Sequence, residues 1–563
     1  MFPRPLFFPD ARLNFAQNLL FPRCIDETLN DTVAVIGHTE SAIQTMTWSE
    51  LRQAVKACTS AMRSFGISWS HHVVGYLGNH INTLVAMLSA TTLGATWSAI
   101  SPDTGVHAVL ERMQQIDPIL LFTDNAVIYN GKTHTMLDKV RELTAGLPGL
   151  KAVVVFETVS TVDLQVDQID IPLGKAWSYQ AFISAWDHGS ELLFPQFPPD
   201  HPVYILYSSG TTGKPKCIVH GALGTLIQHK KEHEIHCDLR PGDRLFYFTT
   251  TTWMMWHWLV SGLASGATIV LYDGSPFRPL DDDGHGELAM PRLIDSLGIT
   301  HFGTSAKYLS ILEQKDIQPR PSLPMKHLKV IYSTGSPLAP STFAYVYRAF
   351  GPDINLASIT GGTDIISLFG APSPLSPVYA GEIQVRGLGM AVQVWDANHK
   401  DITMTGEPGE LVCVKPFPSQ PVRFFGIDGH EAYRKSYFEA FPGVWHHGDF
   451  VRLNPETEGM VMLGRSDGVL KPQGVRFGSA EIYNVLLEHF AEEVADALCV
   501  GRRRELDTDE TVVLFLKMMD GHIFDGDIQR RVKEMMKQEL SARHVPGIVA
   551  ECPEIPVTTN GKK

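Results

Sequence analysis

Up to Gly448 the chain alternates short apolar runs with segments of helical spacing. Residues 51–65 carry apolar side chains at helical intervals, and several apolar runs lead through Gly, Ser or Thr into such a pattern. The strands expected from these runs are Val73–Leu77, Ala152–Phe156, Val203–Tyr207, Thr268–Tyr272 and Lys329–Tyr332. Surface loops are expected where Pro, Gly or Asp gather, at Asp273–Glu287 and Phe369–Pro377. The pattern predicts an α/β fold in which mixed sheets are flanked by helices.

The pattern changes after Gly448, where turns and short strands lead into a helix, a strand and a charged helix. The strand is expected at Thr511–Leu516 and the charged helix at Asp527–Leu540. About 100 residues of this kind are enough for a compact α+β domain. We therefore predict two domains: a large α/β region over 1–464, built of several subdomains, and a small C-terminal domain over 465–563.

Composition narrows the class of protein. A chain of 563 residues is too long for one hydrophobic core, and 44% hydrophobic with 19% charged residues is typical of a globular protein. The net charge of -14 argues against a nucleic-acid partner but leaves room for a local basic pocket. The seven cysteines are scattered and odd in number, which favours a reducing compartment. We see no apolar run long enough to span a membrane, so a cytoplasmic protein is expected.

The stretch "YSSGTTGKPK" follows an apolar run and is rich in hydroxyls, glycines and lysines. Glycines let backbone N–H groups turn toward a phosphate, while hydroxyls donate to its oxygens and lysines neutralise its charge. The Walker A spacing is not met, because Pro215 follows Lys214 and no glycine lies five residues before Gly213. The candidate phosphate-binding residues are Ser208, Ser209, Gly210, Thr211, Thr212, Gly213, Lys214 and Lys216. A solvated Ser/Gly turn is the alternative.

This loop resembles the phosphate-loop signature of the adenylate-forming superfamily, which includes acyl-CoA synthetases, luciferases and the adenylation domains of peptide synthetases. Other stretches resemble the superfamily's further motifs in the same order, so that the resemblance spans nearly the whole chain: Thr360–Asp364, His446–Phe450, Gly464–Ile482 and Ile555–Lys563. The resemblance implies that ATP, with Mg2+, activates a carboxylate as an acyl-adenylate and releases diphosphate. The thiol of CoA then displaces AMP.

The resemblance also implies roles for individual nucleotide-binding residues. Thr363 would hydrogen-bond the α-phosphate, and Asp364, where most relatives have Glu, would help to hold Mg2+. Asp449 would accept hydrogen bonds from both ribose hydroxyls. A helix N-cap is the alternative for Asp364, and a solvated turn is the alternative for Asp449.

Further residues complete the nucleotide site that the resemblance implies. Three successive residues would pack on adenine: Gly335, Ser336 and Pro337. Arg465 would contact ribose or phosphate, and Arg476 would contact a phosphate. Without the resemblance, both arginines would be read as surface residues.

The small domain carries the residues that the resemblance links to motion and to CoA. Lys562 matches the lysine that reaches the substrate carboxylate and the α-phosphate, and with Thr363 and Asp364 it forms the expected catalytic group. Asp467 matches the hinge about which the small, mobile domain rotates between the two half-reactions. Gly474 would allow close approach of the CoA thiol arm. By itself, a lysine in a polar tail is usually solvated.

The acyl pocket is expected around Thr249–Leu263, which is rich in tryptophan, threonine and methionine. Thr252 and Trp253 would lie nearest the carboxylate, with Thr334 as another wall; an apolar core helix is the alternative. Gly361 stands where acetate-specific relatives have a bulky tryptophan, which implies room for a longer acid. The hydroxyls of Thr252, Thr334 and Thr360 could pair with a keto oxygen.

Short stretches of the sequence narrow the resemblance to one branch of the superfamily. "RLNFAQNLL", "SITGGTDI" and "PVTTNGKK" resemble the acetoacetyl-CoA synthetase branch, which activates acetoacetate in the cytosol for lipid synthesis. The residues alone indicate only a small or medium acid larger than acetate. The expected partners are therefore the small molecules acetoacetate, ATP and CoA, with no nucleic acid and no membrane span.

The chain departs from the family pattern at both ends. Most of the segment that usually precedes "ARLNFAQNLL" is missing, and the chain stops one residue after Lys562. We therefore expect adenylation to be weakened while nucleotide binding persists. Three functions stay open: an acetoacetate–CoA ligase, a ligase for another short or medium acid, and a shortened, non-catalytic chain that binds nucleotide or a protein partner.

Overall fold

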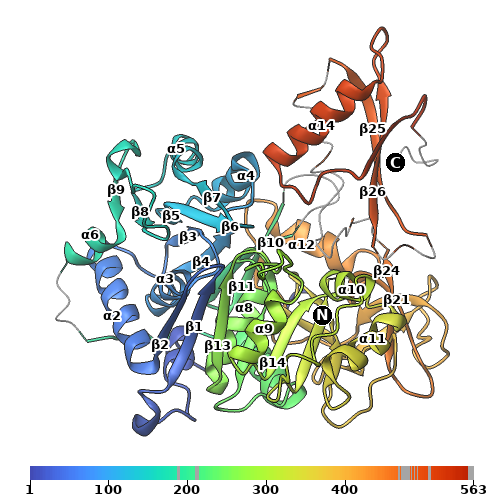
Figure 1. Ribbon diagram of the computed structural model, residues 1–563, viewed down its shortest axis with the longest axis horizontal. Coiled ribbons are helices and arrows are strands. Elements are labelled where there is room, and N and C mark those ends of the chain that lie inside the picture. The colour runs from blue at the N-terminus through green and yellow to red at the C-terminus, as the bar shows by residue number, and fades with distance from the viewer. Residues whose placement is uncertain are drawn as a thin grey trace.

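The structure is a computed structural model, and it describes residues 1–186, 191–208, 215–335, 337–466, 470, 482, 485–486, 489–490, 492–504, 507 and 509–555. Two large sheets form its body, and smaller sheets and a C-terminal unit adjoin them (Figure 1). The predicted α/β class, with mixed sheets and a smaller C-terminal unit, is confirmed.

The first large sheet has eight strands, of which those from β10 to β9 run parallel. Its order is β22 (Arg423–Phe424), β11 (Lys216–Gly221), β10 (Pro202–Ser208), β4 (Thr96–Ile100), β3 (His72–Tyr76), β5 (Leu120–Asp124), β8 (Ala152–Phe156) and β9 (Lys175–Ser178). Strands β4, β5 and β8 are buried at every residue, as in a sheet covered on both faces.

The second large sheet has seven strands and is parallel except for β2. Its order is β16 (Asn355–Ser358), β15 (Val330–Thr334), β14 (His301–Ser305), β12 (Arg244–Tyr247), β13 (Thr268–Asp273), β1 (Val33–Thr39) and β2 (Ile43–Thr47). The carboxyl ends of its parallel strands meet at one edge, where α/β proteins usually bind ligands.

Helices pack on these sheets for reasons visible in the sequence. Helix α2 (Trp48–Ser64) begins with a capping box formed by Thr47 and Glu50, and it contains the predicted helical segment except for its last residue, Phe65, which is the C-cap. Helix α3 (Ile81–Thr92) is buried at all residues but Asn82 and shares one core with strands of both sheets. The other helices of the body are α1 (Phe15–Leu20), α4 (Val106–Ile116), α5 (Leu137–Ala145), α6 (Tyr179–Ser184), α7 (Ala222–Lys231), α8 (Met254–Val260), α9 (Ala289–Ser296), α10 (Ala306–Gln314), α11 (Pro340–Phe350) and α12 (Gly429–Phe438).

Smaller sheets extend the body. They are the hairpin β6 (Ala126–Tyr129)–β7 (Lys132–Thr135), the sheet β17 (Thr360–Gly362)–β18 (Ser367–Ala371)–β19 (Val385–Arg386), and the sheet β20 (Val392–Trp395)–β21 (Gly409–Cys413)–β23 (Trp445–Leu453)–β24 (Met460–Arg465). The surface loop predicted over 369–377 is wrong in its first part, because residues 369–371 belong to β18, which is buried throughout. The loop predicted over 273–287 is confirmed after its first residue, which ends β13.

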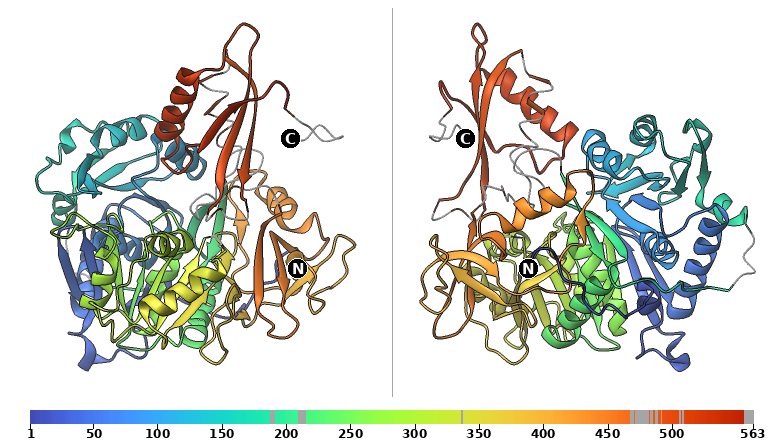
Figure 2. Two further views of the ribbon diagram at one scale, coloured as in Figure 1. Left: turned by 45° about the vertical axis from the view of Figure 1, so that its right-hand side comes forward. Right: turned by 180° about the vertical axis from the view of Figure 1, so that it is seen from behind.

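The C-terminal unit projects from the body (Figure 2). It contains β25 (Val494–Arg502), β26 (Thr511–Met518), β27 (Ile548–Glu551) and α14 (Gly526–Glu539), with an apolar core of its own to which the body adds Ala108. The predicted strand and charged helix of this unit are confirmed. Arg465 is the last residue of β24 in the body's sheet, and a division between 464 and 465 stays a prediction.

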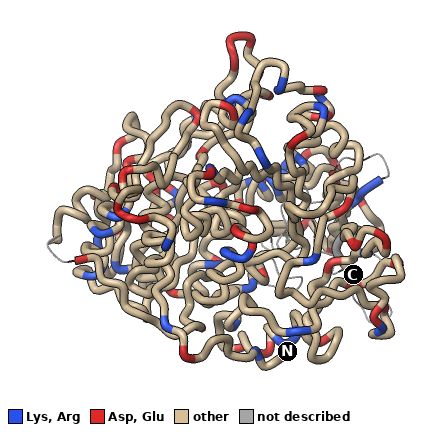
Figure 3. Tube along the Cα trace, turned by 90° about the horizontal axis from the view of Figure 1, so that it is seen from below, with Lys and Arg blue, Asp and Glu red and all other residues tan. Residues whose placement is uncertain are grey.

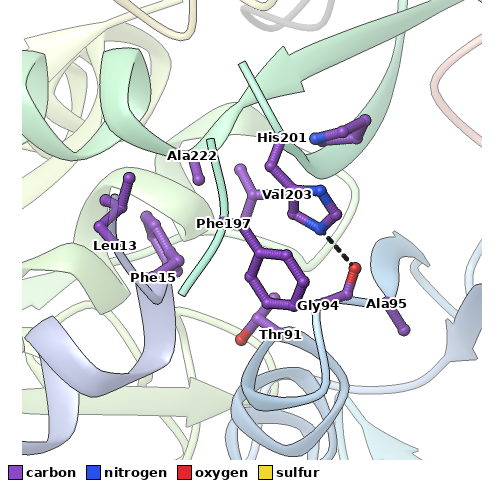
Figure 4. Close-up of a pocket in the computed structure, with 10 residues that line it drawn as sticks. Leu13, Phe15, Thr91, Gly94, Ala95, Phe197, His201, Val203 and Ala222 are labelled. Atoms are coloured by element: carbon purple, nitrogen blue, oxygen red, sulfur yellow. Dashed lines mark hydrogen bonds between the residues drawn. The ribbon is translucent and has the colours of Figure 1, made fainter. Parts of the chain in front are cut away.

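Acidic and basic residues alternate along the described Cα trace (Figure 3), so the charge is not gathered in one segment. Among the described residues, no helix is long and apolar enough to cross a membrane. A small apolar pocket lies where Leu13, Gly94, Phe197 and His201 meet (Figure 4). His201 Nε2 lies 2.7 Å from the carbonyl oxygen of Gly94, and the His201 ring stacks on Phe197. None of the predicted site residues lines this pocket, which is a packing seam.

Candidate active site

The predicted phosphate loop connects two paired strands along the chain. Strands β10 and β11 run antiparallel, with Ser208 opposite Lys216. A P-loop instead leads from a strand into a helix, so this topology agrees with the failed Walker A spacing. The following six loop residues lie outside the described part of the chain: Ser209, Gly210, Thr211, Thr212, Gly213 and Lys214.

The structure brings the loop's Lys216 together with the predicted metal ligand Asp364. Lys216 Nζ lies 4.0 Å from Asp364 Oδ1, and it sits over the rings of Tyr437 and Phe424 at 5.3 and 5.8 Å from their centroids. The Tyr437 hydroxyl donates to Asp364 Oδ1 at 2.5 Å. Asp364 is buried, so these contacts form in a protected setting where charges interact strongly.

Tyr437 is a site residue that the sequence did not reveal. It lies on α12, and its ring stacks on Trp445 at a centroid distance of 3.8 Å. The tyrosines at 433 and 437 share one helix face, which could have signalled a buried stripe. Nothing local links that stripe to Asp364, which is 73 residues away in sequence.

Thr363 and Asp364 lie in the turn between β17 and β18. The alternative that Asp364 caps a helix is therefore wrong, because strand β18 and not a helix follows the turn. A short turn between paired strands fixes the directions of its side chains more tightly than a long loop does. The assignment of these two residues to the α-phosphate and to Mg2+ stays a prediction.

Asp449 lies within strand β23 and is almost fully buried. The alternative of a solvated turn is therefore wrong. His447 Nε2 lies 3.7 Å from Asp449 Oδ2, and both side chains are about 1% exposed. Asp449 is paired in register with Arg465 of β24, whose side chain lies outside the described atoms, as does the whole of Arg476.

A second acid–histidine pair lies beside Asp449 on the same sheet. Glu410 Oε2 contacts His446 Nε2 at 2.8 Å and accepts a hydrogen bond from the Ser466 hydroxyl at 2.7 Å. Burial acts to raise the pKa of Glu410, but the hydrogen bonds from His446 and Ser466 bring that pKa below its ordinary value. Glu410 therefore stays ionised and anchors the end of the motif that contains Asp449.

The residues expected to pack on adenine follow β15. Gly335 has φ +91°, a conformation that glycine adopts without a steric penalty, so the chain turns sharply at the end of the strand. Pro337 lies just before α11, whereas Ser336 lies outside the described residues. The turn lies at the carboxyl edge of the second sheet, and its contact with adenine stays a prediction.

Thr252 joins the two large sheets at the predicted acyl pocket. Its Oγ1 accepts a hydrogen bond of 2.6 Å from the N–H of Ser101, which directly follows β4 of the first sheet. Trp253 caps α8 and packs edge-on against Tyr247 at the end of β12. Trp256 and Trp258 are fully buried, so the core-helix alternative holds for α8 itself, while Thr252 and Trp253 precede it.

Thr334 and Gly361 lie near the same edge. The Thr334 hydroxyl donates to the carbonyl oxygen of Ile359 at 2.8 Å. A Cβ at Gly361 would lie 1.9 Å from the carbonyl oxygen of Ser367, on the neighbouring strand β18. The hairpin therefore has its own reason for glycine at 361, and the interpretation of Gly361 as extra room for the acid stays a prediction.

The predicted catalytic and hinge residues of the C-terminal unit lie outside the described part of the chain. They are Asp467, Gly474 and Lys562. What the structure does show is where the unit contacts the body. The N–H of Gly105, at the start of α4, donates to the carbonyl oxygen of Leu540 at 2.8 Å, just after α14.

Comparisons with known proteins identify the family of the chain. A family model described as AMP-binding enzyme matches residues 23–419, and the model of the AMP-binding enzyme C-terminal domain matches residues 481–562. Malonamoyl-CoA synthetase vrtB of Penicillium aethiopicum is 54% identical, over 100% of this chain and 78% of that protein. Acetoacetyl-CoA synthetase of Gallus gallus is 48% identical, over 99% of this chain and 82% of that protein. The solved structure of acetoacetyl-CoA synthetase from Streptomyces lividans superposes with a TM-score of 0.77 at 38% identity, covering 100% of this chain and 82% of that one.

The chain therefore belongs to the AMP-binding enzyme family, as the order of its motifs predicted. Within that family it lies in the acyl-CoA synthetase branch, whose members are AMP-forming ligases that use ATP to join an acid to CoA. ATP and CoA are thus its substrates. The resemblance to acetoacetyl-CoA synthetases is confirmed across nearly the whole chain.

Proposed function

We propose that the chain joins a short 3-oxo acid, acetoacetate in the first place, to CoA through an acyl-adenylate. The observation that carries this proposal is the hydroxyl of Thr252. Because it accepts the N–H of Ser101, its own proton can be donated to a substrate oxygen. The 3-carbonyl of acetoacetate is an acceptor of this kind, and butyrate lacks it. The named activities of the relatives support the same class of acid.

In the first half-reaction, a carboxylate oxygen attacks the α-phosphorus and diphosphate leaves. We assign the described groups Lys216, Thr363 and Asp449 to the β- and γ-phosphates, the α-phosphate and the ribose. Negative charge grows on the phosphates as the bond forms, so fixed donors and cations there lower the barrier. Lys562 would come from a C-terminal domain over 465–563, which rotates about Asp467 and then presents Gly474 to CoA.

The proposal includes Mg2+, and the residues fit it. Protein sites usually hold Mg2+ through one or two carboxylates together with substrate phosphates and water. Asp364 supplies one such carboxylate, oriented by the Tyr437 hydroxyl. Among the described residues no cluster of three acidic, histidine or cysteine side chains could hold a metal, which fits an ion that arrives with the nucleotide. The ion would neutralise phosphate charge, as Lys216 does beside it.

Malonamate is the second candidate acid, and Thr334 favours it. The only hydroxyl proton of Thr334 is donated to Ile359, so toward a substrate this side chain can only accept. The terminal amide of malonamate has N–H groups to donate, whereas the methyl group of acetoacetate has none. Since methyl and amino groups are nearly equal in size, pocket volume separates them poorly. The relative at 54% identity is named a malonamoyl-CoA synthetase.

We also propose that the enzyme acts in the cytosol and supplies lipid synthesis. All seven cysteines are free thiols, and five of them are buried. Free thiols persist in a reducing compartment, which supports the location. An activated 3-oxo thioester is a building block of the kind that lipid synthesis consumes, so fractionation followed by tracing of labelled acetoacetate into lipid tests both statements.

ATP–pyrophosphate exchange with a panel of acids tests the proposed function. Acetoacetate, malonamate, butyrate, hexanoate and acetate are compared at equal concentration, and CoA is then added so that the thioester can be identified by mass spectrometry. We expect exchange with the two 3-oxo acids at least about 10-fold faster than with butyrate, because butyrate leaves Thr252 without its acceptor. Faster exchange with butyrate or hexanoate, or none with any acid, would contradict the proposal.

A further inference from the structure

One helix close to the candidate site, α7, ends in a rare type of turn. Helix α7 runs directly into a π-helical turn, η3, over Glu232–His236. Such turns are rare and frequently lie at functional sites. Three polar side chains at this junction are buried to 2% exposure or less and contact strand β18 or the residue just before it: Gln228, His229 and Glu232.

These side chains bind three successive residues, of which Ile366 directly precedes β18 and the other two begin it. His229 Nε2–H donates to the carbonyl oxygen of Ile366 at 2.7 Å. Glu232 Oε1 accepts the Ser367 hydroxyl at 2.5 Å and the Leu368 N–H at 3.1 Å. Gln228 adds a longer contact to the Ser367 hydroxyl, at 3.3 Å. The Ile366 carbonyl, the Ser367 hydroxyl and the Leu368 N–H thus all bind side chains of one helical segment.

Glu232 is a buried carboxylate whose oxygens are well satisfied. Its Oε2 accepts the Trp258 indole N–H at 2.9 Å, and Lys231 Nζ lies 3.5 Å from Oε1. Burying a charge is costly, and apolar residues of similar volume often stabilise a core more. A carboxylate here supplies what apolar packing lacks, which is a defined direction for each donor it binds.

The residue that His229 binds has a strained backbone. Ile366 has φ +47° and is fully buried, although β-branched residues rarely adopt left-handed conformations. Such conformations persist only where the surroundings determine them, and they gather at functional sites. Ile366 closes the turn that starts at Thr363, and its N–H donates to Gly362 at 2.9 Å. Asp364 lies two residues before it.

We propose that His229 and Glu232 are positioning residues, which hold Ile366 in its left-handed conformation and thereby fix Thr363 and Asp364 toward the nucleotide. The inference rests on the proposed function of that turn. His229 lies in the last turn of α7, and Glu232, three positions further on, begins the π-helical turn, so the two side chains share one face of this helical segment. Neither residue touches a substrate, so their effect on the reaction passes through the backbone of the turn.

The chain offers a matched control in the same helical segment. His236 Nδ1–H donates to the carbonyl oxygen of Pro372 at 2.8 Å, and its Nε2 accepts the N–H of Leu388 at 3.0 Å. It is buried like His229 and binds the chain just beyond the far end of β18. Replacing either histidine by phenylalanine removes a buried hydrogen bond of the same kind, but only His229 acts on the turn.

The test compares His229→Phe with His236→Phe in the full chain. We expect similar losses of thermal stability, because each variant leaves one buried carbonyl unpaired. Only His229→Phe should slow pyrophosphate exchange per folded molecule, by about 10- to 100-fold, and raise the KM for ATP with Mg2+. His229→Gln keeps an N–H donor and should recover part of the rate. The exchange rate of Glu232→Gln should lie between the rates of His229→Phe and His229→Gln.

The outcomes separate this inference from the proposed function. Wild-type exchange with no acid would contradict the proposed function, and the affinity for ATP with Mg2+ by calorimetry then serves as the readout. If His229→Phe and His236→Phe bind ATP and exchange pyrophosphate equally well per folded molecule, the positioning role is wrong. If His229→Phe lowers only the melting temperature, His229 is an ordinary core residue.

Discussion

The β17–β18 hairpin and the C-terminal unit contact the rest of the molecule in opposite ways. The hairpin is backed by buried side chains that bind its backbone directly, at 2.7 Å for His229 and 3.1 Å for Glu232. Among the described residues, the C-terminal unit contacts the body through one backbone hydrogen bond, a small apolar contact and partly exposed ion pairs, such as Arg543 with Asp103 at 3.7 Å. Exposed ion pairs contribute about 0–1 kcal/mol each.

This difference suggests how one enzyme serves two half-reactions. A buried polar network specifies one geometry, because each donor and acceptor must be satisfied at once. A face held by screened charges and a few contacts can be exchanged for another at small cost. We infer that the hairpin is kept in place for the α-phosphate chemistry, while the C-terminal unit is free to change its contact with the body.

The largest expected effect on the rate comes from removing one carboxylate charge from the hairpin, compared with removing one from the C-terminal unit. Asp364→Asn should slow pyrophosphate exchange by about 100- to 1,000-fold, because it removes a protected charge from the proposed phosphate site. Asp509→Asn, which breaks the ion pair of Asp509 with Lys307 at 3.8 Å, should change the rate by less than about 3-fold. Pyrophosphate exchange rates of the two purified variants measure the difference. Equal losses of rate would contradict the proposed contrast between the hairpin and the C-terminal unit.

Low pH should lower the stability of the core that contains His220 and His257. Burial lowers the pKa values of His220 and His257 to about 3, so both rings are neutral in the folded state. Below pH about 6.5 the unfolded chain takes up protons that the folded chain does not, so the stability is present above that pH and is lost as pH falls toward 3. At pH 5 the loss is about 2 kcal/mol for each histidine.

Thermal melts between pH 7 and pH 4.5 measure this effect. Asp273 acts in the opposite direction, because burial raises its pKa to about 6 and protonation then favours the folded state. A His257→Gln variant should show a shallower loss of stability than the wild type between pH 6.5 and pH 5. The same slope in both proteins would show that His257 does not titrate as described.

A methyl group added where the C-terminal unit contacts the body should have a smaller effect on the reaction rate. A Cβ at Gly105 would lie 2.4 Å from the carbonyl oxygen of Gln538, so Gly105→Ala should disfavour this contact of the C-terminal unit. We expect one half-reaction to slow by about 10-fold while the other changes little. Gly526→Ala is the control, since a Cβ there meets nothing within 4 Å. Exchange and thioester formation are measured separately, and unchanged rates in both would contradict the docking role.

The smallest effect is expected on the choice between acids. Thr334→Val keeps the shape of the side chain but removes its acceptor, so it should lower the preference for malonamate over acetoacetate by about 5- to 10-fold. The ratio of kcat/KM for the two acids measures this. A ratio equal to that of the wild type would show that Thr334 does not contact the terminal group.

Much of the fold and part of the site follow from sequence patterns. Buried parallel strands such as β8 carry unbroken apolar runs, which the sequence displays directly. The loop predicted over 369–377 is wrong at its first three residues, because the Pro and Gly content of this stretch indicates a loop, whereas β18 exists through its pairing with β17. Local composition holds no information about such a partner.

The motifs singled out Lys216 and Asp364 as candidates but not the residues that bind Asp364 and its turn. Tyr437 binds Asp364 from 73 positions away in the sequence and His229 binds Ile366 from 137 positions away, and each looks like an ordinary core residue of its own helix. The left-handed conformation of Ile366 is equally hidden, because isoleucine gives no local sign of it. Contacts of this kind depend on the tertiary fold and need the structure.

One competition experiment tests the central claim most directly. Acetoacetate and butyrate are supplied together at equal concentration with ATP, Mg2+ and limiting CoA, and the thioesters are counted by mass spectrometry. If the Thr252 hydroxyl donates to the 3-carbonyl, acetoacetyl-CoA should exceed butyryl-CoA by at least about 10-fold, and Thr252→Val should bring the ratio close to one. Equal amounts of the two thioesters from the wild-type chain would contradict the account.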